Sequence, residues 1–171
     1  AGARPAKAIF NLGAGVEVLL ATPALPDDVP VIRLEDAGMA AQMGEYVTLA
    51  VLRAYRELDA YVAQQREGRW QPRPRIAKSA FGVGILGFGV LGRAVAEALA
   101  PFGFPLRAWS LSRKRSPGVE SFAGRAELAS FLAASQVLVC LLPLTQETRG
   151  LLDRTAFAVL PRGARRTIPY S

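Results

Sequence analysis

A glycine-rich turn between two apolar segments constrains the fold of this chain more than any other feature. The turn reads Gly87-Phe-Gly-Val-Leu-Gly92, so its glycines have the spacing G-x-G-x-x-G. The segment before it, Phe81 to Leu86, carries no charge and predicts a buried strand. The segment after it, Leu91 to Ala100, predicts a helix that ends near Pro101. A strand, a tight turn and a helix in direct succession indicate the first unit of a parallel α/β sheet.

The chain beyond this turn continues the alternation of strands and helices. Strands are predicted at 105–109, 118–122 and 137–142, and helices at 127–134 and 153–160. The run from Val137 to Leu142 is apolar throughout, which is typical of a strand covered on both faces. We therefore expect an α/β fold with a doubly wound parallel sheet.

The first third of the chain predicts a smaller unit followed by a long helix. Residues 8–20 read as a strand, a glycine turn and a short helix, and another short strand is expected near Val31. Apolar residues at helical spacing predict one helix over 36–66, with Asp36 as its N-cap. The predicted division is a first domain at 1–68, a proline-containing and cationic linker at 69–80, a second domain at 81–164 and an atypical tail at 165–171.

The composition excludes several kinds of chemistry. The 171 residues include no histidine and one cysteine, Cys140, so they cannot form a Ser-His-Asp triad, a His-ligated zinc site or an internal disulfide. We expect no metal site. A single cysteine within an apolar run suits a buried thiol in a reducing compartment, and we expect a cytoplasmic protein.

The net charge of +7 favours a local anion site over a nucleic-acid surface. The cations are scattered along the chain and do not form a basic stripe interleaved with aromatic residues. The longest uncharged apolar run, Ser79 to Gly92, is too short and too rich in glycine to span a bilayer. We expect neither a nucleic-acid partner nor a membrane partner.

The glycine-rich turn suits the diphosphate of a dinucleotide. Gly87 would make the tight turn, Gly89 would remove a side chain from the path of the diphosphate, and Gly92 would let the helix pack closely on the strand. The helix N-terminus would then offer free N–H groups and a partial positive charge to the anion. The alternative is a glycine-rich strand–helix turn without a ligand.

The end of the second predicted strand favours NADP over NAD. An NAD site usually has a carboxylate there for the ribose 2′-hydroxyl, but the first carboxylate here is Glu120. The strand is followed instead by hydroxyl groups and then by Arg113 and Lys114, which suit a 2′-phosphate. The alternative is a solvated charge run.

The loop after Cys140 should lie beside the same crevice, because it follows another parallel strand. Pro143 could line the adenosine side, and Thr145 or Thr148 could donate hydrogen bonds to a ligand there. An ordinary strand–helix turn explains the same residues equally well.

Six stretches in series carry a resemblance to a known family. They are Leu12-Gly-Ala-Gly-Val16, Arg33-Leu-Glu-Asp-Ala-Gly-Met39, Gln42-Met-Gly-Glu-Tyr46, Gly84-Ile-Leu-Gly-Phe-Gly-Val-Leu-Gly92, Gly118-Val-Glu-Ser-Phe-Ala-Gly124 and Leu141-Leu-Pro-Leu-Thr-Gln-Glu-Thr148. Together they resemble the D-isomer-specific 2-hydroxyacid dehydrogenases, above all the NADPH-preferring glyoxylate/hydroxypyruvate reductases. Leu111 is a departure, since those reductases tend to have another basic residue there.

The resemblance implies a fold and a set of binding residues. The fold is an incomplete Rossmann-like doubly wound parallel sheet, preceded by part of a smaller flavodoxin-like substrate domain and a long connecting helix. The implied substrate-binding residues are Ala14 and Gly15. The implied cofactor-binding residues are Gly87, Gly89, Val90, Leu91, Gly92, Trp109, Ser110, Ser112, Arg113, Lys114, Leu142, Pro143 and Thr148.

The resemblance also implies an activity, the NAD(P)H-dependent reduction of a small 2-keto acid to a D-2-hydroxy acid. In the family an Arg, a Glu and a His carry catalysis, and none can be assigned here. We therefore expect a catalytically incomplete chain that is truncated at both ends, and we expect it to form a homodimer. The alternatives are a non-catalytic dinucleotide-binding module and a module that dimerises through the 36–66 helix.

Overall fold

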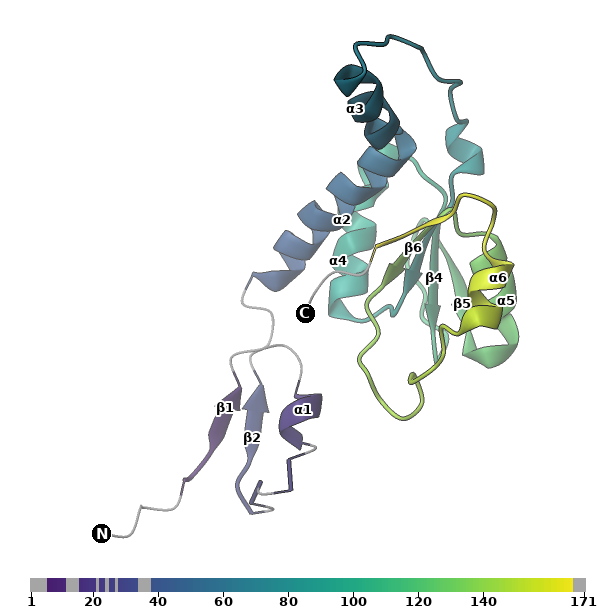
Figure 1. Ribbon diagram of the computed structural model, residues 1–171. Helices are drawn as coiled ribbons and strands as arrows, with labels where there is room; N and C mark the ends of the chain where they lie inside the picture. Colours follow the sequence, from purple (N-terminus) through teal and green to yellow (C-terminus); the bar gives the residue numbers. More distant parts are fainter. Residues whose placement is uncertain are drawn as a thin grey trace.

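The computed structural model describes residues 6–11, 16–20, 22–23, 25–26, 28–33 and 38–167 (Figure 1). The first elements are β1 (Ile9–Asn11), α1 (Glu17–Leu20), β2 (Val31–Arg33), α2 (Met39–Tyr55), α3 (Leu58–Arg66) and the 3₁₀ helix η1 (Lys78–Ala80). They are followed by β3 (Val83–Leu86), α4 (Val90–Leu99), the 3₁₀ helix η2 (Ala100–Phe102), β4 (Leu106–Ser110), β5 (Val119–Ala123), α5 (Gly124–Ala133), β6 (Val137–Cys140), α6 (Arg154–Val159) and β7 (Arg165–Thr167).

Five strands form a parallel sheet in the order β5-β4-β3-β6-β7. β3 lies at the centre, where Val83 is in register with Leu106 of β4 on one side and with Val137 of β6 on the other. The chain adds β4 and β5 on one side of β3 and then crosses to add β6 and β7 on the other. This reversal between β3 and β6 is the topological switch point at which open α/β sheets bind their ligands. The prediction of a doubly wound parallel sheet is confirmed.

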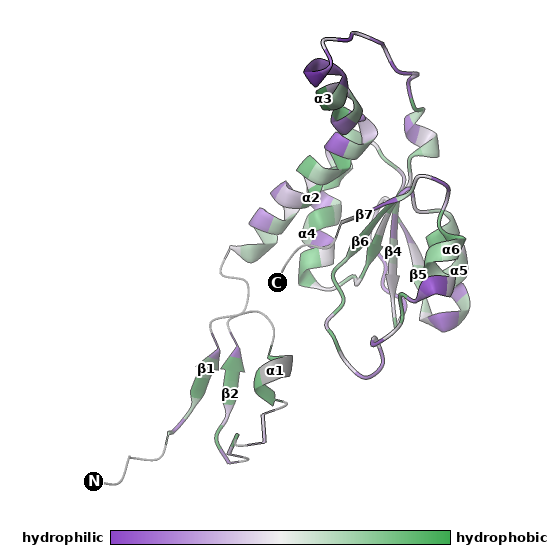
Figure 2. Ribbon diagram, in the orientation of Figure 1, coloured by the Kyte–Doolittle hydropathy of each residue, from purple (hydrophilic) through white to green (hydrophobic). Residues whose placement is uncertain are grey.

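Alternate strand residues point into two separate cores, because successive side chains of a strand face opposite sides of the sheet. The first core packs α2 and α4 on one face and includes Val47, Val51, Val83, Ile85, Val95, Leu99, Ala108, Val137 and Val139. The second core lies beneath α5 and α6 and includes Leu86, Trp109, Phe131, Leu132, Leu138 and Leu151. In Figure 2 the hydrophobic colouring covers β6 and much of α4.

The prediction of one helix over 36–66 is wrong, because the chain breaks into α2 and α3. Glu57 lies between them with φ 51°, in the left-handed region that a continuous helix cannot contain. Its carboxylate accepts a hydrogen bond at 2.7 Å from Arg73 of the linker, which supports the break. Leu58, one of the apolar residues at helical spacing, lies beyond this break and is 43% exposed. α2 begins at Met39, and Asp36 lies outside the described residues.

The prediction that residues 165–171 form an atypical tail is wrong for its first three residues. Arg165 to Thr167 form β7, which pairs in parallel with β6. A strand at the edge of a sheet forms through its backbone groups and tolerates charged side chains. The Arg165 side chain extends to Asp59 of α3, with 2.7 Å between Nη1 and Oδ2. Residues 168–171 lie outside the described residues.

The segment 69–77 has no regular structure but is held against α3. The backbone N–H of Gln71 donates to the side chain of Gln64 at 2.9 Å, and that of Arg73 donates to the Tyr61 hydroxyl at 3.0 Å. Trp70 in the same segment is 81% exposed. Because α2 shares the first core with β3 and α4, this helix packs with the larger sheet that follows it. The domain division at 69–80 stays a prediction.

The N-terminal strands form a unit of their own. β1 and β2 pair in parallel, with Ile9 opposite Val31, and α1 lies between them in the chain. This arrangement confirms the strand, helix and strand expected in the first 33 residues, whereas the glycine turn at 13–15 lies outside the described residues. None of the helices in the described segments has the length and apolar character needed to cross a bilayer.

Candidate functional site

At two positions of the turn, Gly87 and Gly92, the backbone lies so close to other backbone atoms that a side chain would not fit without a shift. Gly87 has φ +103°, and a Cβ on it would lie 2.9 Å from the carbonyl carbon and oxygen of Leu141, beyond β6. A Cβ on Gly92 would lie 2.2 Å from the carbonyl oxygen of Gly87. Real Cβ atoms do not approach backbone atoms so closely. Glycine at position 87 therefore lets the turn approach the backbone that follows β6, and glycine at position 92 lets α4 rest directly on the turn that leads into it.

Gly89 is different, because it faces open space. Its φ of −86° suits any residue, and a Cβ on it would have no described atom within 4 Å. Phe88 before it is 1% exposed and anchors the turn in the core, while Val90 after it is 67% exposed. A side chain at Gly89, the N-cap of α4, would occupy this open space, which we call the cradle.

The first turn of α4 borders this cradle and suits an anion. Its N–H groups, at Val90, Leu91 and Gly92, have no acceptor within the helix. No side chain of the described residues caps this turn, and no acidic residue lies in it. The helix dipole adds a partial positive charge at the same place. These features fit the diphosphate of a dinucleotide.

At the end of β4, Trp109 and Ser110, two of the residues expected to bind the cofactor, are buried and hydrogen-bonded to the backbone. Trp109 is fully buried, and its indole N–H donates to the carbonyl oxygen of Gly124 at 2.9 Å. Ser110 is 8% exposed, and its hydroxyl donates to the carbonyl oxygen of Ser112 at 2.7 Å. The side chains exposed to a ligand therefore come after these two residues, beginning with Leu111 and Ser112.

Arg113 is held by two anchors. Its Nη1 donates to the carbonyl oxygen of Ser121 in β5 at 2.5 Å, and its Nη2 pairs with Oε1 of Glu127 in α5. The other carboxylate oxygen of Glu127 accepts the backbone N–H of Ala123 at 2.7 Å. This backbone hydrogen bond, assisted by Arg113, lowers the pKa of Glu127 below its usual value. Lys114 follows and is half-buried.

Glu120, the first carboxylate in the chain after β4, does not lie near the carboxyl end of β4. Glu120 is in register with Arg107 near the amino end of β4, and the two side chains form an ion pair at 2.9 Å. The carboxylate that does reach the loop is Glu127, which the sequence analysis did not single out. The sequence feature that could have pointed to Glu127 is its position, because it is an acidic residue in the first turn of a helix that follows a strand.

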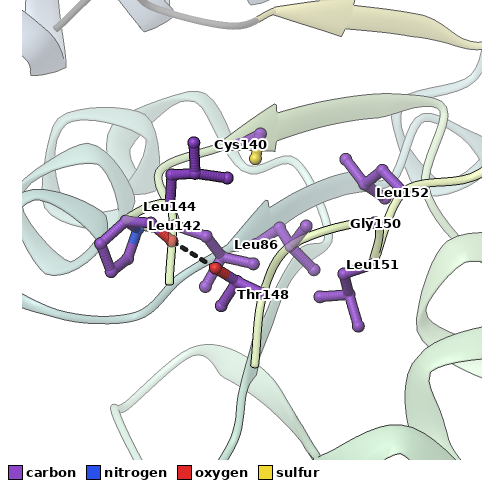
Figure 3. A pocket seen from close by; sticks show the side chains of 9 residues that line it. Leu86, Cys140, Leu142, Leu144, Thr148, Gly150, Leu151 and Leu152 are labelled. Carbon is purple, nitrogen blue, oxygen red and sulfur yellow. Dashed lines mark hydrogen bonds between the residues drawn. The ribbon is translucent and has the colours of Figure 1, made fainter. Parts of the chain in front are cut away.

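A small pocket lies between the carboxyl ends of β3 and β6 (Figure 3). Its volume is about 200 Å³, and it is lined by Leu86, Cys140, Leu142, Pro143, Leu144, Thr148, Gly150, Leu151 and Leu152. The Thr148 hydroxyl donates to the carbonyl oxygen of Pro143 at 2.5 Å and accepts the backbone N–H of Thr145 at 2.8 Å. The hydroxyl groups of the threonines therefore bond within their own turn, and most of the side chains that line the pocket are leucines.

The structure brings most of the expected residues to one edge of the sheet. The glycine turn follows β3, the serine and cation loop follows β4, and the Leu142–Thr148 loop follows β6. Ala14 and Gly15 lie outside the described residues. The individual roles of these residues toward a cofactor or substrate stay predictions.

The parallel sheet and its glycine turn define a Rossmann-type dinucleotide-binding domain. The chain matches the profile described as "D-isomer specific 2-hydroxyacid dehydrogenase, NAD binding domain" over residues 48–166. The chain therefore belongs to the D-isomer specific 2-hydroxyacid dehydrogenase family, and the predicted resemblance is confirmed.

Several relatives are similar over nearly the whole chain. A glyoxylate/hydroxypyruvate reductase A of Klebsiella pneumoniae (strain 342) is 50% identical over 163 residues, which cover 92% of this chain and 52% of that protein. A D-isomer specific 2-hydroxyacid dehydrogenase from Xanthobacter autotrophicus Py2, solved in complex with NADPH and MES, has a TM-score of 0.88 and 45% identity, covering 95% of this chain and 51% of that one.

A third relative is an NADPH-dependent glyoxylate/hydroxypyruvate reductase from Sinorhizobium meliloti, solved in complex with NADP and sulfate. Its TM-score is 0.84 at 39% identity, and the match covers 91% of this chain and 49% of that one. The chain thus spans about half the length of the relatives that it matches.

Because Gly92 is tightly packed and Gly89 faces open space, we expect substitution by alanine to have different effects at the two positions. Gly92→Ala should lower the free energy of unfolding by about 1–3 kcal/mol or more, because the new Cβ meets the backbone of Gly87. Gly89→Ala should change it by less than about 1 kcal/mol, because the space is open. Gly89→Ala should nevertheless weaken NADPH binding by blocking the diphosphate. Denaturant unfolding and fluorescence titration measure the two effects, and undiminished binding by Gly89→Ala would contradict the assignment.

Proposed function

We propose that this chain supplies the NADPH-binding part of a reductase that converts glyoxylate, hydroxypyruvate or a related small 2-keto acid to a D-2-hydroxy acid. The observation that carries the proposal is the pairing of an open anion cradle at Gly89 with a cationic loop after the neighbouring strand β4. The family membership and the names of the relatives support the same activity.

The choice of NADPH over NADH rests on the charges at the end of β4. The guanidinium of Arg113 has five N–H groups, and two of them are used by Ser121 and Glu127 in the contacts described. The remaining N–H groups, together with the ammonium of Lys114, suit the oxygens of a 2′-phosphate. Residues 110–115 include no carboxylate that would accept a ribose 2′-hydroxyl. NAD is the second choice of cofactor.

The proposed roles of this chain are binding and orientation. Bound NADPH would supply the hydride for the keto carbon. The first turn of α4 would hold the diphosphate, and the apolar pocket beside Leu142 and Pro143 would hold part of the adenosine. Reduction also needs a proton donor for the keto oxygen, and in this family the resemblance gives that role to a histidine, which the 171 residues do not contain. We therefore assign no catalytic residue to this chain.

The first test is a fluorescence titration with NADPH and NADH. The 171-residue chain should bind NADPH saturably and more tightly than NADH. The double substitution Arg113→Ala plus Lys114→Ala should weaken NADPH binding roughly ten- to hundredfold, since charge-assisted hydrogen bonds to the 2′-phosphate are lost. Its effect on NADH should be less than about threefold. Failure to bind NADPH, or an equal loss for both coenzymes, would count against the proposal.

The second test measures NADPH oxidation with glyoxylate. The chain alone should show little or no turnover, because it lacks the imidazole acid. A chimera that joins residues 1–167 to the part of the Klebsiella pneumoniae relative following the matched region should turn over faster, by roughly a hundredfold or more. A chimera that binds NADPH but does not oxidise it would instead favour the alternative, a non-catalytic dinucleotide-binding module.

We also propose that the chain self-associates through α2 and α3. Tyr46 and Leu49 on α2 are 48% and 65% exposed. Leu58 and Val62 on α3 join Trp70 in the lining of a groove of about 840 Å³. Exposed apolar surface of this kind is typical of an interaction site. Sedimentation should show a dimer, and a monomer at high protein concentration would contradict this part of the proposal.

A cytoplasmic location is the last part of the proposal. Cys140 is free and partly buried at the end of β6. A chain with one unpaired cysteine suits a compartment in which thiols stay reduced, and the cytoplasm is such a compartment.

A further inference from the structure

We propose that Glu127 is a positioning residue for coenzyme selection, because it holds the guanidinium of Arg113 at the carboxyl end of β4 for the 2′-phosphate of NADPH. This inference rests on the proposed function. Glu127 acts through Arg113 and has no contact of its own with the cofactor in this proposal.

The first argument is that Arg113 needs an anchor. It lies in the loop between β4 and β5, and its side chain is 45% exposed. An arginine at such a position has many accessible rotamers, and binding a phosphate would require it to give up that freedom. An anchor that fixes the guanidinium before the cofactor arrives reduces this entropic cost.

The second argument is that Glu127 is itself fixed by the backbone. Its Oε2 accepts the N–H of Ala123 at 2.7 Å, while its Oε1 accepts from Nη2 of Arg113. A rigid strand end thus positions a carboxylate, and the carboxylate positions a cation. The backbone hydrogen bond also lowers the pKa of Glu127, so its side chain is ionised at neutral pH and keeps its attraction for Arg113.

The third argument concerns the opposing effect of the carboxylate charge. A negative charge beside a 2′-phosphate repels it, which would weaken NADPH binding. The Glu127 side chain is 39% exposed, so solvent screens this repulsion. The hydrogen bond that Nη2 of Arg113 donates to Oε1 of Glu127 acts at contact distance and is screened less. We therefore expect the orienting effect of Glu127 to exceed the repulsion.

The test compares dissociation constants for NADPH and NADH across five variants of the 171-residue chain. They are Glu127→Ala, Glu127→Gln, Arg113→Ala, the double variant Arg113→Ala plus Glu127→Ala, and the control Glu120→Ala, which removes a carboxylate that pairs with Arg107 instead. Thermal unfolding of each variant separates loss of binding from loss of fold.

The expected result is a selective loss. Glu127→Ala should weaken NADPH binding about tenfold and leave NADH binding unchanged within about threefold. Glu127→Gln keeps an acceptor oxygen and should recover at least part of the loss. The double variant should be no weaker toward NADPH than Arg113→Ala alone, because Glu127 acts through Arg113. Glu120→Ala should bind both coenzymes like the unchanged chain.

Several results would overturn the inference. Tighter NADPH binding by Glu127→Ala would mean that repulsion is the larger effect. An equal loss of affinity for both coenzymes would indicate only a structural role at the start of α5. The inference would also fail if Glu127→Gln recovered none of the lost affinity, or if the losses in the double variant were additive. If the chain does not prefer NADPH, or if Arg113→Ala has no effect on it, the proposed function fails. If Arg113→Ala weakens NADPH binding but Glu127→Ala does not, the inference about Glu127 fails while the proposed function stands.

Discussion

The contact of the first turn of α4 with the turn before it governs both the core and the site. A Cβ on Gly92 would lie 2.2 Å from the carbonyl oxygen of Gly87, so any side chain there would force the backbone to shift. The close contact lets α4 pack against the sheet, where its Val95 and Leu99 are fully buried in the core shared with α2. The same geometry leaves Gly89 and the helix N-terminus open to solvent. One backbone contact therefore provides a packed interior and an anion cradle at once.

The central strands were predictable from the sequence because their side chains are covered on both faces. β3 and β6 read as uninterrupted apolar runs, which only a buried strand tolerates in a sheet of this kind. β7 was not predictable in this way, since an edge strand is selected by its backbone pairing and carries Arg165 without penalty. The break between α2 and α3 at Glu57 could not be predicted from the sequence either, because apolar residues keep helical spacing on both sides of it.

The candidate site was partly predictable for a similar reason. The glycine turn directly follows β3 and Arg113 lies three residues after β4, so the parallel topology alone brings them to one edge. Glu127 comes fourteen residues after Arg113 and belongs to a helix. Which side of that helix faces the loop depends on how Phe131 and Leu132 pack beneath it, and this is set by the tertiary structure. A partner of this kind is found only when the fold is known.

The contrast between the two tryptophans has an optical consequence. Trp109 is fully buried, its indole is tied to Gly124, and it immediately precedes the loop that carries Arg113. Trp70 is 81% exposed beside α3. Their emission should differ in wavelength and in accessibility to a dissolved quencher, because one indole lies in an apolar interior and the other in water. The chain thus contains two intrinsic reporters, Trp109 near the sheet edge and Trp70 in the linker.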